Sequence, residues 1–294
     1  MIGITKKISV KLLIFGDVFG KLGREGVKRI LPKWREKFSP DAVIANVENI
    51  AHGKGIGMKQ IQELKDAGVD IFTGGNHSLE GKDFAEVLND ETLPILRPAN
   101  MGEGIPGHGV LTYETKNGER LLVINLIGRV FMKPASRQGG QEYGSPFDAV
   151  DKILEEYGPP AGEAGNSTPY KILDWHADAT SEKSVMGWYL DGRVSAVFGT
   201  HSHVPTADAK ILPKGTAYIS DVGMVGPYHS IIGVEIEPAF ERFKKQTKNT
   251  IQPVEAGPIE VNGLYLELES GRAASAKASA AKAVDIQHLR EIIP

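Results

Sequence analysis

The chain has 294 residues, of which 41% are hydrophobic and 24% are charged, an ordinary balance for a globular protein. It contains no cysteine, which excludes disulfides, thiolate ligands and a cysteine nucleophile, so nitrogen and oxygen atoms must hold any metal. The formal net charge of −3 gives no support for an extended nucleic-acid surface, but it leaves room for a small nucleotide in a locally positive pocket.

The amino-terminal segment shows no targeting signal. Its apolar stretch, residues 10–15, is interrupted by Lys11 and runs into an Asp-Gly turn instead of a cleavage site. No stretch approaches the roughly 20 apolar residues needed to cross a bilayer. We therefore expect a cytoplasmic protein with no membrane partner.

The first hundred residues alternate between strand and helix patterns. Continuous apolar runs predict buried strands at 12–15, 41–45 and 69–73, and helical spacing predicts helices at about 23–38 and 58–67. This alternation predicts right-handed crossovers and a parallel sheet.

The rest of the chain is mixed. Asn117-Gly118 predicts a hairpin between strands 110–115 and 120–125. Helices are expected at 147–157 and 181–190, the second capped by Thr180 or Ser181 with Glu182 in its first turn, and a surface loop at 158–169. Further strands are expected at 170–175, 194–198, 216–219, 231–236 and 259–268.

These elements predict an α/β fold in one domain, residues 1–294, with two packed mixed β-sheets flanked by helices. The Ala/Ser/Lys tract at 271–283 is expected to be a loose tail or an exposed helix.

Polar side chains recur where the expected strands end: Asp17, Glu48, Asn49, Asn76, His77, His176, His201 and His203. Each one alone has an ordinary explanation, such as a turn, a helix cap or a hydrogen-bonded histidine near the core. The pair His201-x-His203 is a stronger signal, because alternation places both rings on one side of an extended segment. Ligands of α/β sheets bind at the carboxyl ends of strands, so the whole set predicts one cleft with ligands suited to Mn²⁺, Fe or Zn²⁺.

A dinucleotide-binding loop is the competing interpretation of the glycines at 53–57. The fingerprint would need glycine at position 58, where this chain has Met58. We set that interpretation aside.

Seven segments together resemble a known family. They are GDVFG (16–20), NVEN (46–49), GGNH (74–77), LRPAN (96–100), HADATSEK (176–183), GTHSHV (199–204) and DVGM (221–224). In this order they resemble the YmdB-like family of calcineurin-type metallophosphoesterases, over about residues 10–234. That family is assigned 2′,3′-cyclic-nucleotide 2′-phosphodiesterase activity, so the resemblance implies a metal-dependent phosphodiesterase with the calcineurin-like fold.

The resemblance also implies a ligand set for two divalent metal ions (Fe, Mn or Zn). One ion would be held by Asp17, Glu48, Asn49 and His203, and the other by Glu48, Asn76, His176 and His201, with Glu48 as the bridge. The wider superfamily usually has a histidine where this chain has Phe19, and an aspartate as the bridge. Both departures match the YmdB-like branch.

The implied reaction is direct attack on phosphorus by a metal-bridging hydroxide. His77 is expected to protonate the leaving alkoxide or to stabilise developing charge. Arg129 is either a phosphate contact or a surface arginine, and Asp178 and Glu182 are candidates to orient His176 or neighbouring backbone.

The expected partner is a small nucleotide or an RNA 2′,3′-cyclic phosphate end, and a homo-oligomer is compatible with the sequence. Two alternatives stay open. One is another specificity on the same metals: a phosphomonoesterase, a 3′,5′-cyclic phosphodiesterase or a phosphoprotein phosphatase. The other is a regulatory protein that binds a nucleotide or an RNA end.

Overall fold

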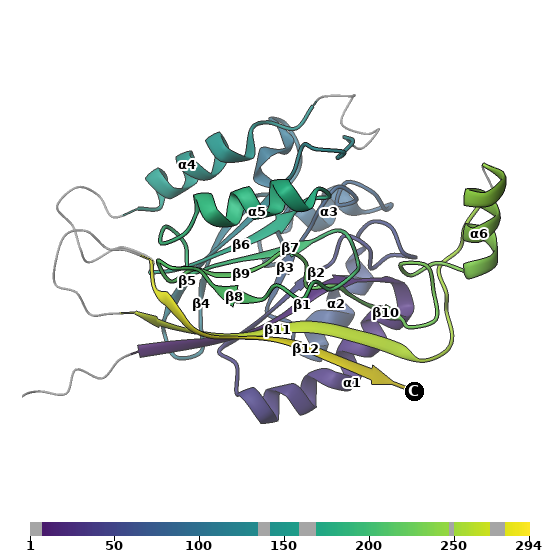
Figure 1. Ribbon diagram of the computed structural model, residues 1–294, viewed down its shortest axis with the longest axis horizontal. Helices are drawn as coiled ribbons and strands as arrows, with labels where there is room; N and C mark the ends of the chain where they lie inside the picture. Colours follow the sequence, from purple (N-terminus) through teal and green to yellow (C-terminus); the bar gives the residue numbers. More distant parts are fainter. Residues whose placement is uncertain (1–7, 135–141, 159–168, 247–249, 271–279) are drawn as a thin grey trace, which may run out of the picture.

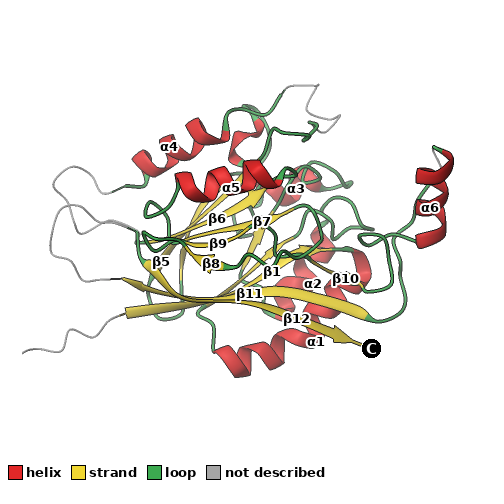
Figure 2. Cartoon of the chain, viewed as in Figure 1, coloured by secondary structure: helices red, strands yellow, loops and turns green. Residues whose placement is uncertain are grey.

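Two six-stranded sheets stack face to face in the computed structural model, with helices on their outer faces (Figures 1 and 2). The structure describes residues 8–134, 142–158, 169–246, 250–270 and 280–294. The predicted α/β architecture with two mixed sheets is confirmed.

The first sheet has the strand order β12-β11-β10-β1-β2-β3. Its strands are β1 (Ile8–Val18), β2 (Ala42–Asn46), β3 (Ile71–Thr73), β10 (Met224–Pro227), β11 (Ile259–Ser270) and β12 (Lys282–Ile293). Strands β10, β1, β2 and β3 are parallel, while β11 and β12 add an antiparallel edge. The predicted parallel sheet is therefore one half of a mixed sheet.

The second sheet has the strand order β4-β5-β6-β7-β9-β8. Its strands are β4 (Val110–Glu114), β5 (Arg120–Ile127), β6 (Tyr170–His176), β7 (Ala196–Thr200), β8 (Lys210–Ile211) and β9 (Ala217–Ile219). The central strands β5, β6, β7 and β9 are parallel, and β4 and β8 pair antiparallel at the two edges.

Alternation along β1 divides the core into layers. Leu12 and Ile14 belong to the apolar cluster between the sheets, whereas Leu13 and Phe15 pack with the helices on the outer side. The helices on that side are α1 (Gly20–Phe38), α2 (Met58–Ala67) and α3 (Phe84–Asn89). The second sheet is covered in the same way by α4 (Pro146–Glu156) and α5 (Thr180–Tyr189).

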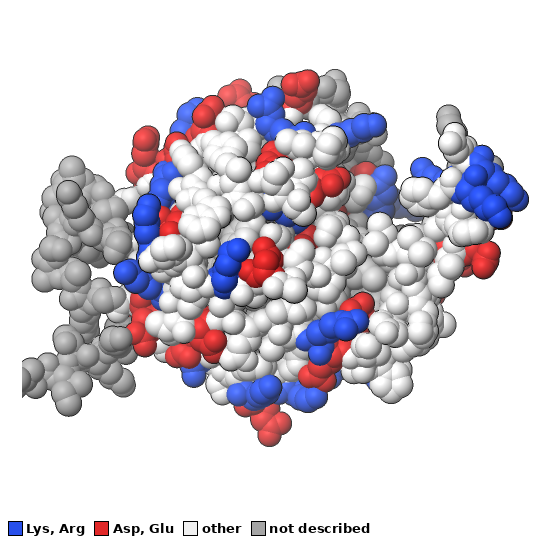
Figure 3. All heavy atoms as spheres, in the orientation of Figure 1, with Lys and Arg blue, Asp and Glu red and all other residues white. Residues whose placement is uncertain are grey.

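Charged side chains are scattered over the face shown in the space-filling view, with lysine and arginine interspersed among aspartate and glutamate (Figure 3). This mixed surface agrees with the small net charge of the chain.

Three local predictions were wrong. Residues 231–236 form a short bridged turn and then enter helix α6 (Ile236–Lys245), which projects from the body (Figure 1). Pro238 fits there because the first turn of a helix needs no hydrogen bond from its nitrogen. At α5 the N-cap is Ala179, with no capping side chain, and Thr180 and Ser181 lie inside the helix.

The third correction concerns the carboxyl-terminal tract. Ala280, Ala281 and Ala283 are buried, and β12 begins at Lys282, so this end of the tract is neither a tail nor a helix. Residues 271–279, and 159–168 of the predicted surface loop, lie outside the described residues. Helix α3, strands β8 and β10 and the short 3₁₀ turn at Ala99–Met101 were not predicted.

None of the helices in the described ranges combines the length and the apolar character needed to span a membrane.

Candidate metal centre

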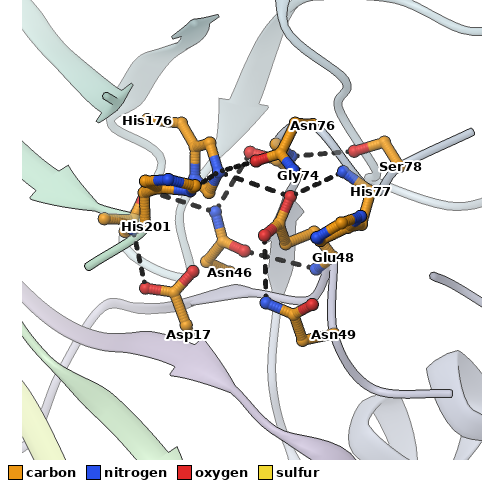
Figure 4. Close-up of polar contacts among 12 residues, drawn as sticks. Asp17, Asn46, Glu48, Asn49, Gly74, Asn76, His77, Ser78, His176 and His201 are labelled. Atoms are coloured by element: carbon orange, nitrogen blue, oxygen red, sulfur yellow. Dashed lines mark hydrogen bonds and ion pairs between the residues drawn. The ribbon is translucent and has the colours of Figure 1, made fainter. Parts of the chain in front are cut away.

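The carboxyl edges of the two sheets meet at one cluster of polar side chains (Figure 4). From the first sheet, Asp17 lies at the end of β1, Glu48 and Asn49 follow β2, and Asn76 and His77 follow β3. From the second sheet, His176 ends β6, and His201 and His203 follow β7. The structure therefore brings all the residues predicted at strand ends to one edge, as the strand-end rule requires.

One half of the cluster is centred on His176, whose Nε2 has three polar neighbours. Its Nε2 lies 2.9 Å from Asn76 Oδ1, 3.1 Å from His201 Nδ1 and 3.4 Å from Glu48 Oε2. Ligand atoms of Glu48, His176 and His201 all lie within 4.8 Å of one another. Nitrogen and oxygen donors facing a common point in this way suit a transition-metal ion or Zn²⁺.

The other half contains Asp17, Asn49 and His203. Asn49 Nδ2 donates to Glu48 Oε1 at 2.9 Å and lies 3.2 Å from His203 Nε2. Rotating this amide by 180° would turn its oxygen toward the same neighbours. Asp17 Oδ2 accepts a hydrogen bond from the backbone nitrogen of His201 at 3.0 Å, whereas the buried Asp17 Oδ1 has no hydrogen-bond partner among the described residues. An unpartnered carboxylate oxygen is costly to bury, and a cation beside it would satisfy it, so the donor set fits a second metal here.

Glu48 lies between the two halves. Its Oε1 faces Asn49 and its Oε2 faces His176. The backbone nitrogen of His77 donates to Oε2 at 2.8 Å and holds the carboxylate in this orientation. A carboxylate with one oxygen toward each half has the placement that a bridging ligand needs.

Gly75 leaves room for this arrangement. A Cβ at this position would lie 2.3 Å from both Glu48 Oε2 and His176 Nε2. Such contacts are far inside van der Waals distance, so only glycine at position 75 lets the chain after β3 pass these two side chains.

A buried network behind His176 fixes its tautomer. His176 Nδ1 lies 2.9 Å from Thr200 Oγ1, and that hydroxyl donates to Asp174 Oδ1 at 2.7 Å. Asp174 accepts further hydrogen bonds from Asn46 Nδ2 and Thr73 Oγ1. Because the Thr200 hydroxyl has one hydrogen, which goes to Asp174, it accepts from His176 Nδ1–H. The Nε2 lone pair of His176 is thereby left free to face a metal.

This network was not predicted from the sequence. The available signal was Asp174 itself, a charged residue inside the apolar strand β6, where all seven residues are buried. Of the two roles predicted for Asp178 and Glu182, orienting His176 is not seen, since Asp178 Oδ2 lies 3.8 Å from His201 Nε2 instead. Glu182 does hold backbone, because it accepts hydrogen bonds from the backbone nitrogens of Arg129 and Val130.

Burial is the largest cause of the pKa shifts in the centre. It raises the pKa of Asp17 to about 6 and that of Asp174 to about 7, and it raises the pKa of Glu48 well above its usual range. It lowers the pKa of His201 to about 4 and that of His176 well below its usual range. Both imidazoles are therefore neutral at pH 7, the form that binds metal, and cations would favour the ionised carboxylates.

His77 lies beside the candidate ligands but is not one of them. Its Nδ1 lies 3.1 Å from Glu80 Oε1, and Glu80 Oε2 pairs with Lys54 Nζ at 3.0 Å. Burial lowers the pKa of His77, against the opposing effect of Glu80. His77 lines a cavity of about 350 Å³ together with the candidate ligands Asn76 and His201.

Arg129 lies apart from this cavity. It lines a neighbouring cavity of about 460 Å³ with Glu142 and Glu182, and its guanidinium lies 3.9 Å from Glu142.

Comparison with known proteins gives consistent matches. The family model for YmdB-like proteins matches residues 13–279. The 2′,3′-cyclic-nucleotide 2′-phosphodiesterase of Bacillus subtilis (strain 168) is 43% identical over 260 residues, which cover 88% of this chain and 92% of that protein.

Two solved structures share the fold. A novel phosphatase from Mycoplasma pneumoniae has a TM-score of 0.84 at 31% identity, with 98% of this chain and 95% of that chain covered. A hypothetical protein from Thermus thermophilus has a TM-score of 0.81 at 37% identity, with 97% of this chain and 100% of that chain covered.

Proposed function

Since the chain belongs to the YmdB-like protein family, we propose that it hydrolyses 2′,3′-cyclic nucleotides, or RNA ends carrying the same cyclic phosphate, at a centre for two divalent metal ions. The observation that carries this proposal is the convergence of Glu48, His176 and His201 beside the unpartnered Asp17 Oδ1. The activity of the Bacillus subtilis relative and the phosphatase fold of the Mycoplasma pneumoniae protein support the same reaction class.

The residues divide into two sets around Glu48. Asn76, His176 and His201 would hold one ion, Asp17, Asn49 and His203 would hold the other, and the two oxygens of Glu48 would reach both. Bound there, two divalent ions such as Fe, Mn²⁺ or Zn²⁺ would lower the pKa of a water molecule and stabilise the phosphoryl oxygens.

His77 would supply the proton that the leaving group needs. Hydrolysis of the ring forms one bond between a water oxygen and phosphorus and breaks one bond between phosphorus and a ribose oxygen, which must gain a proton. Glu80 occupies Nδ1 of His77, so Nε2 is the nitrogen available to the substrate in the cavity. With Nδ1–H held by Glu80, Nε2 carries a proton only in the imidazolium form, which the negative charge of Glu80 favours. In that form His77 would donate the Nε2 proton to the ribose oxygen as it leaves.

The decisive test is an assay of the metal-reconstituted protein with 2′,3′-cAMP, 3′,5′-cAMP and p-nitrophenyl phosphate. Glu48→Gln keeps the shape of the side chain but removes its charge, and Glu155→Gln, on the exposed face of α4, is the matched control. We expect selective turnover of 2′,3′-cAMP, lost in Glu48→Gln and retained in Glu155→Gln.

Other outcomes would change the assignment. Turnover of only the other two substrates would keep the metal centre and replace the specificity. Binding of 2′,3′-cAMP with no turnover under any metal would favour a regulatory nucleotide-binding protein instead.

A further inference from the structure

The cavity beside His77 has a second wall that the proposed reaction does not use. Asn76, His77 and His201 line it on the side of the metal centre, and residues 131–134 line it as well. Its volume of about 350 Å³ lies within the range of small-molecule sites, about 300–1,000 Å³. A molecule with its phosphate at the metal ligands would therefore extend toward residues 131–134.

Two features of Phe131 on this wall are energetically unfavourable: the exposure of its ring and the conformation of its backbone. Its side chain is 80% exposed although it lines the cavity, and its backbone has φ 63°, in the left-handed region that side-chain-bearing residues rarely adopt. An aromatic ring left in water and a strained backbone both weaken folding, and such strain concentrates at binding sites.

The segment around Phe131 is nevertheless anchored on both sides. Before it, the backbone nitrogens of Arg129 and Val130 donate to the two carboxylate oxygens of Glu182 on α5, at 2.9 and 3.3 Å. After it, Met132 is buried and the Tyr143 hydroxyl donates to the Lys133 carbonyl at 3.1 Å. Glu182, a residue of the HADATSEK segment, thus helps to hold Phe131 at the cavity.

We propose that Phe131 is the platform on which the nucleobase of the substrate stacks. The proposal rests on the proposed function, because it places the phosphate of the same molecule at the metal centre. Every base has an aromatic face, so stacking on Phe131 would favour nucleotides over base-free phosphate esters with little preference among bases. The substrate class is then nucleoside 2′,3′-cyclic phosphates in general.

The test compares substrates with and without a base. KM and kcat are measured for 2′,3′-cAMP, 2′,3′-cUMP and ribose 2′,3′-cyclic phosphate with the parent, Phe131→Ala and Phe131→Trp. Phe243→Ala is the matched control, because Phe243 is also 80% exposed but lies on α6. We expect Phe131→Ala to raise KM for both nucleotides roughly 5- to 150-fold, the range that base–aromatic stacking supplies, and to leave KM for the ribose phosphate unchanged. Phe131→Trp and Phe243→Ala should resemble the parent.

Equal changes with and without a base, or no change in Phe131→Ala, would overturn the stacking role while leaving the proposed function intact. If the parent hydrolyses no cyclic phosphate, the proposed function fails, and a titration still tests the platform. Adenosine 3′-phosphate should then bind the parent more tightly than Phe131→Ala, and ribose 3′-phosphate should bind both equally. Equal binding of adenosine 3′-phosphate by the two proteins would overturn the proposal.

Discussion

Lys183 and Asp221 form an ion pair inside the protein, with Lys183 Nζ 2.5 Å from Asp221 Oδ2 and both side chains almost completely buried. The pair also binds the segment after β7: Lys183 Nζ donates to the Thr200 carbonyl at 2.7 Å, and Asp221 Oδ2 accepts from the Ser202 backbone nitrogen at 3.1 Å. This segment carries two candidate ligands, His201 and His203. Lys183 lies on helix α5 and Asp221 lies in a distant loop, so these two elements together fix the path of the segment.

The fixed path matters because both histidines of the segment have unfavourable backbone conformations. His201 has φ 101° and His203 has φ 65°, values that a residue with a side chain seldom adopts. Such conformations persist only when the surrounding structure enforces them. The Lys183–Asp221 pair provides contacts on both sides of His201.

Replacing Lys183 with methionine should therefore weaken both the fold and metal binding. Lys183→Met leaves Asp221 buried without its counter-ion, which should lower the free energy of unfolding by about 3–5 kcal/mol. Lys183→Met/Asp221→Asn removes both charges and should recover much of that stability but not the affinity for Mn²⁺. Urea unfolding of the metal-free proteins and calorimetric titration with Mn²⁺ measure the two effects.

The control for this experiment is the surface ion pair between Lys33 and Glu291. Lys33→Met should change the free energy of unfolding by no more than about 1 kcal/mol. Unchanged Mn²⁺ affinity in Lys183→Met would show that the buried pair does not position the histidines.

Thr200→Val should weaken metal binding although it replaces no candidate ligand. The valine has a similar shape but no hydroxyl, so His176 Nδ1 loses its acceptor and Asp174 loses a donor. Loss of a partner that orients a ligating histidine costs about 10- to 100-fold in metal affinity. Thr200→Ser keeps the hydroxyl and should bind Mn²⁺ like the parent. Equal weakening in the serine variant would assign the effect to packing instead of to the hydrogen bond.

The sequence predicted the elements that carry the candidate ligands because their signals are local. Apolar runs that end in polar residues marked β1, β2, β3 and β6, and parallel strands bring their carboxyl ends to one edge. The hairpin was found because Asn117-Gly118 is a specific turn signal. The candidate ligands meet where that reasoning placed them.

The parts that were missed depend on distant partners. Strand β12 is an edge strand with many exposed positions and weak alternation, and its register with β11 joins residues far apart in the chain, such as Ile259 and Ile293. Residues 231–236 are apolar enough for a strand but form a turn that leads into α6, where they find no sheet partner among the described strands. The links from Lys183 to Asp221 and from Thr200 to Asp174 arise only when separate strands and helices pack together.

Gly75→Ala should abolish metal binding because the added methyl group would occupy space that Glu48 and His176 fill. The added Cβ would lie 2.3 Å from Glu48 Oε2 and His176 Nε2, so at least one of these side chains must move. Metal content measured by mass spectrometry after reconstitution should fall to background. Gly144→Ala is the matched control, because the nearest atom to its Cβ would be 3.5 Å away, an ordinary contact. Full metal content in Gly75→Ala would mean that the chain after β3 can shift without disturbing the ligands.

His77→Ala should separate catalysis from metal binding. The contact from His77 to Glu48 Oε2 uses the backbone nitrogen, which alanine keeps, so the metal content should stay that of the parent. Loss of a general acid should lower kcat for 2′,3′-cAMP by about 10²–10⁴-fold. Bis(p-nitrophenyl) phosphate has a leaving group that needs little protonation, so its kcat should fall far less. Equal losses for both substrates would show that the side chain stabilises charge on the phosphoryl group instead of donating a proton.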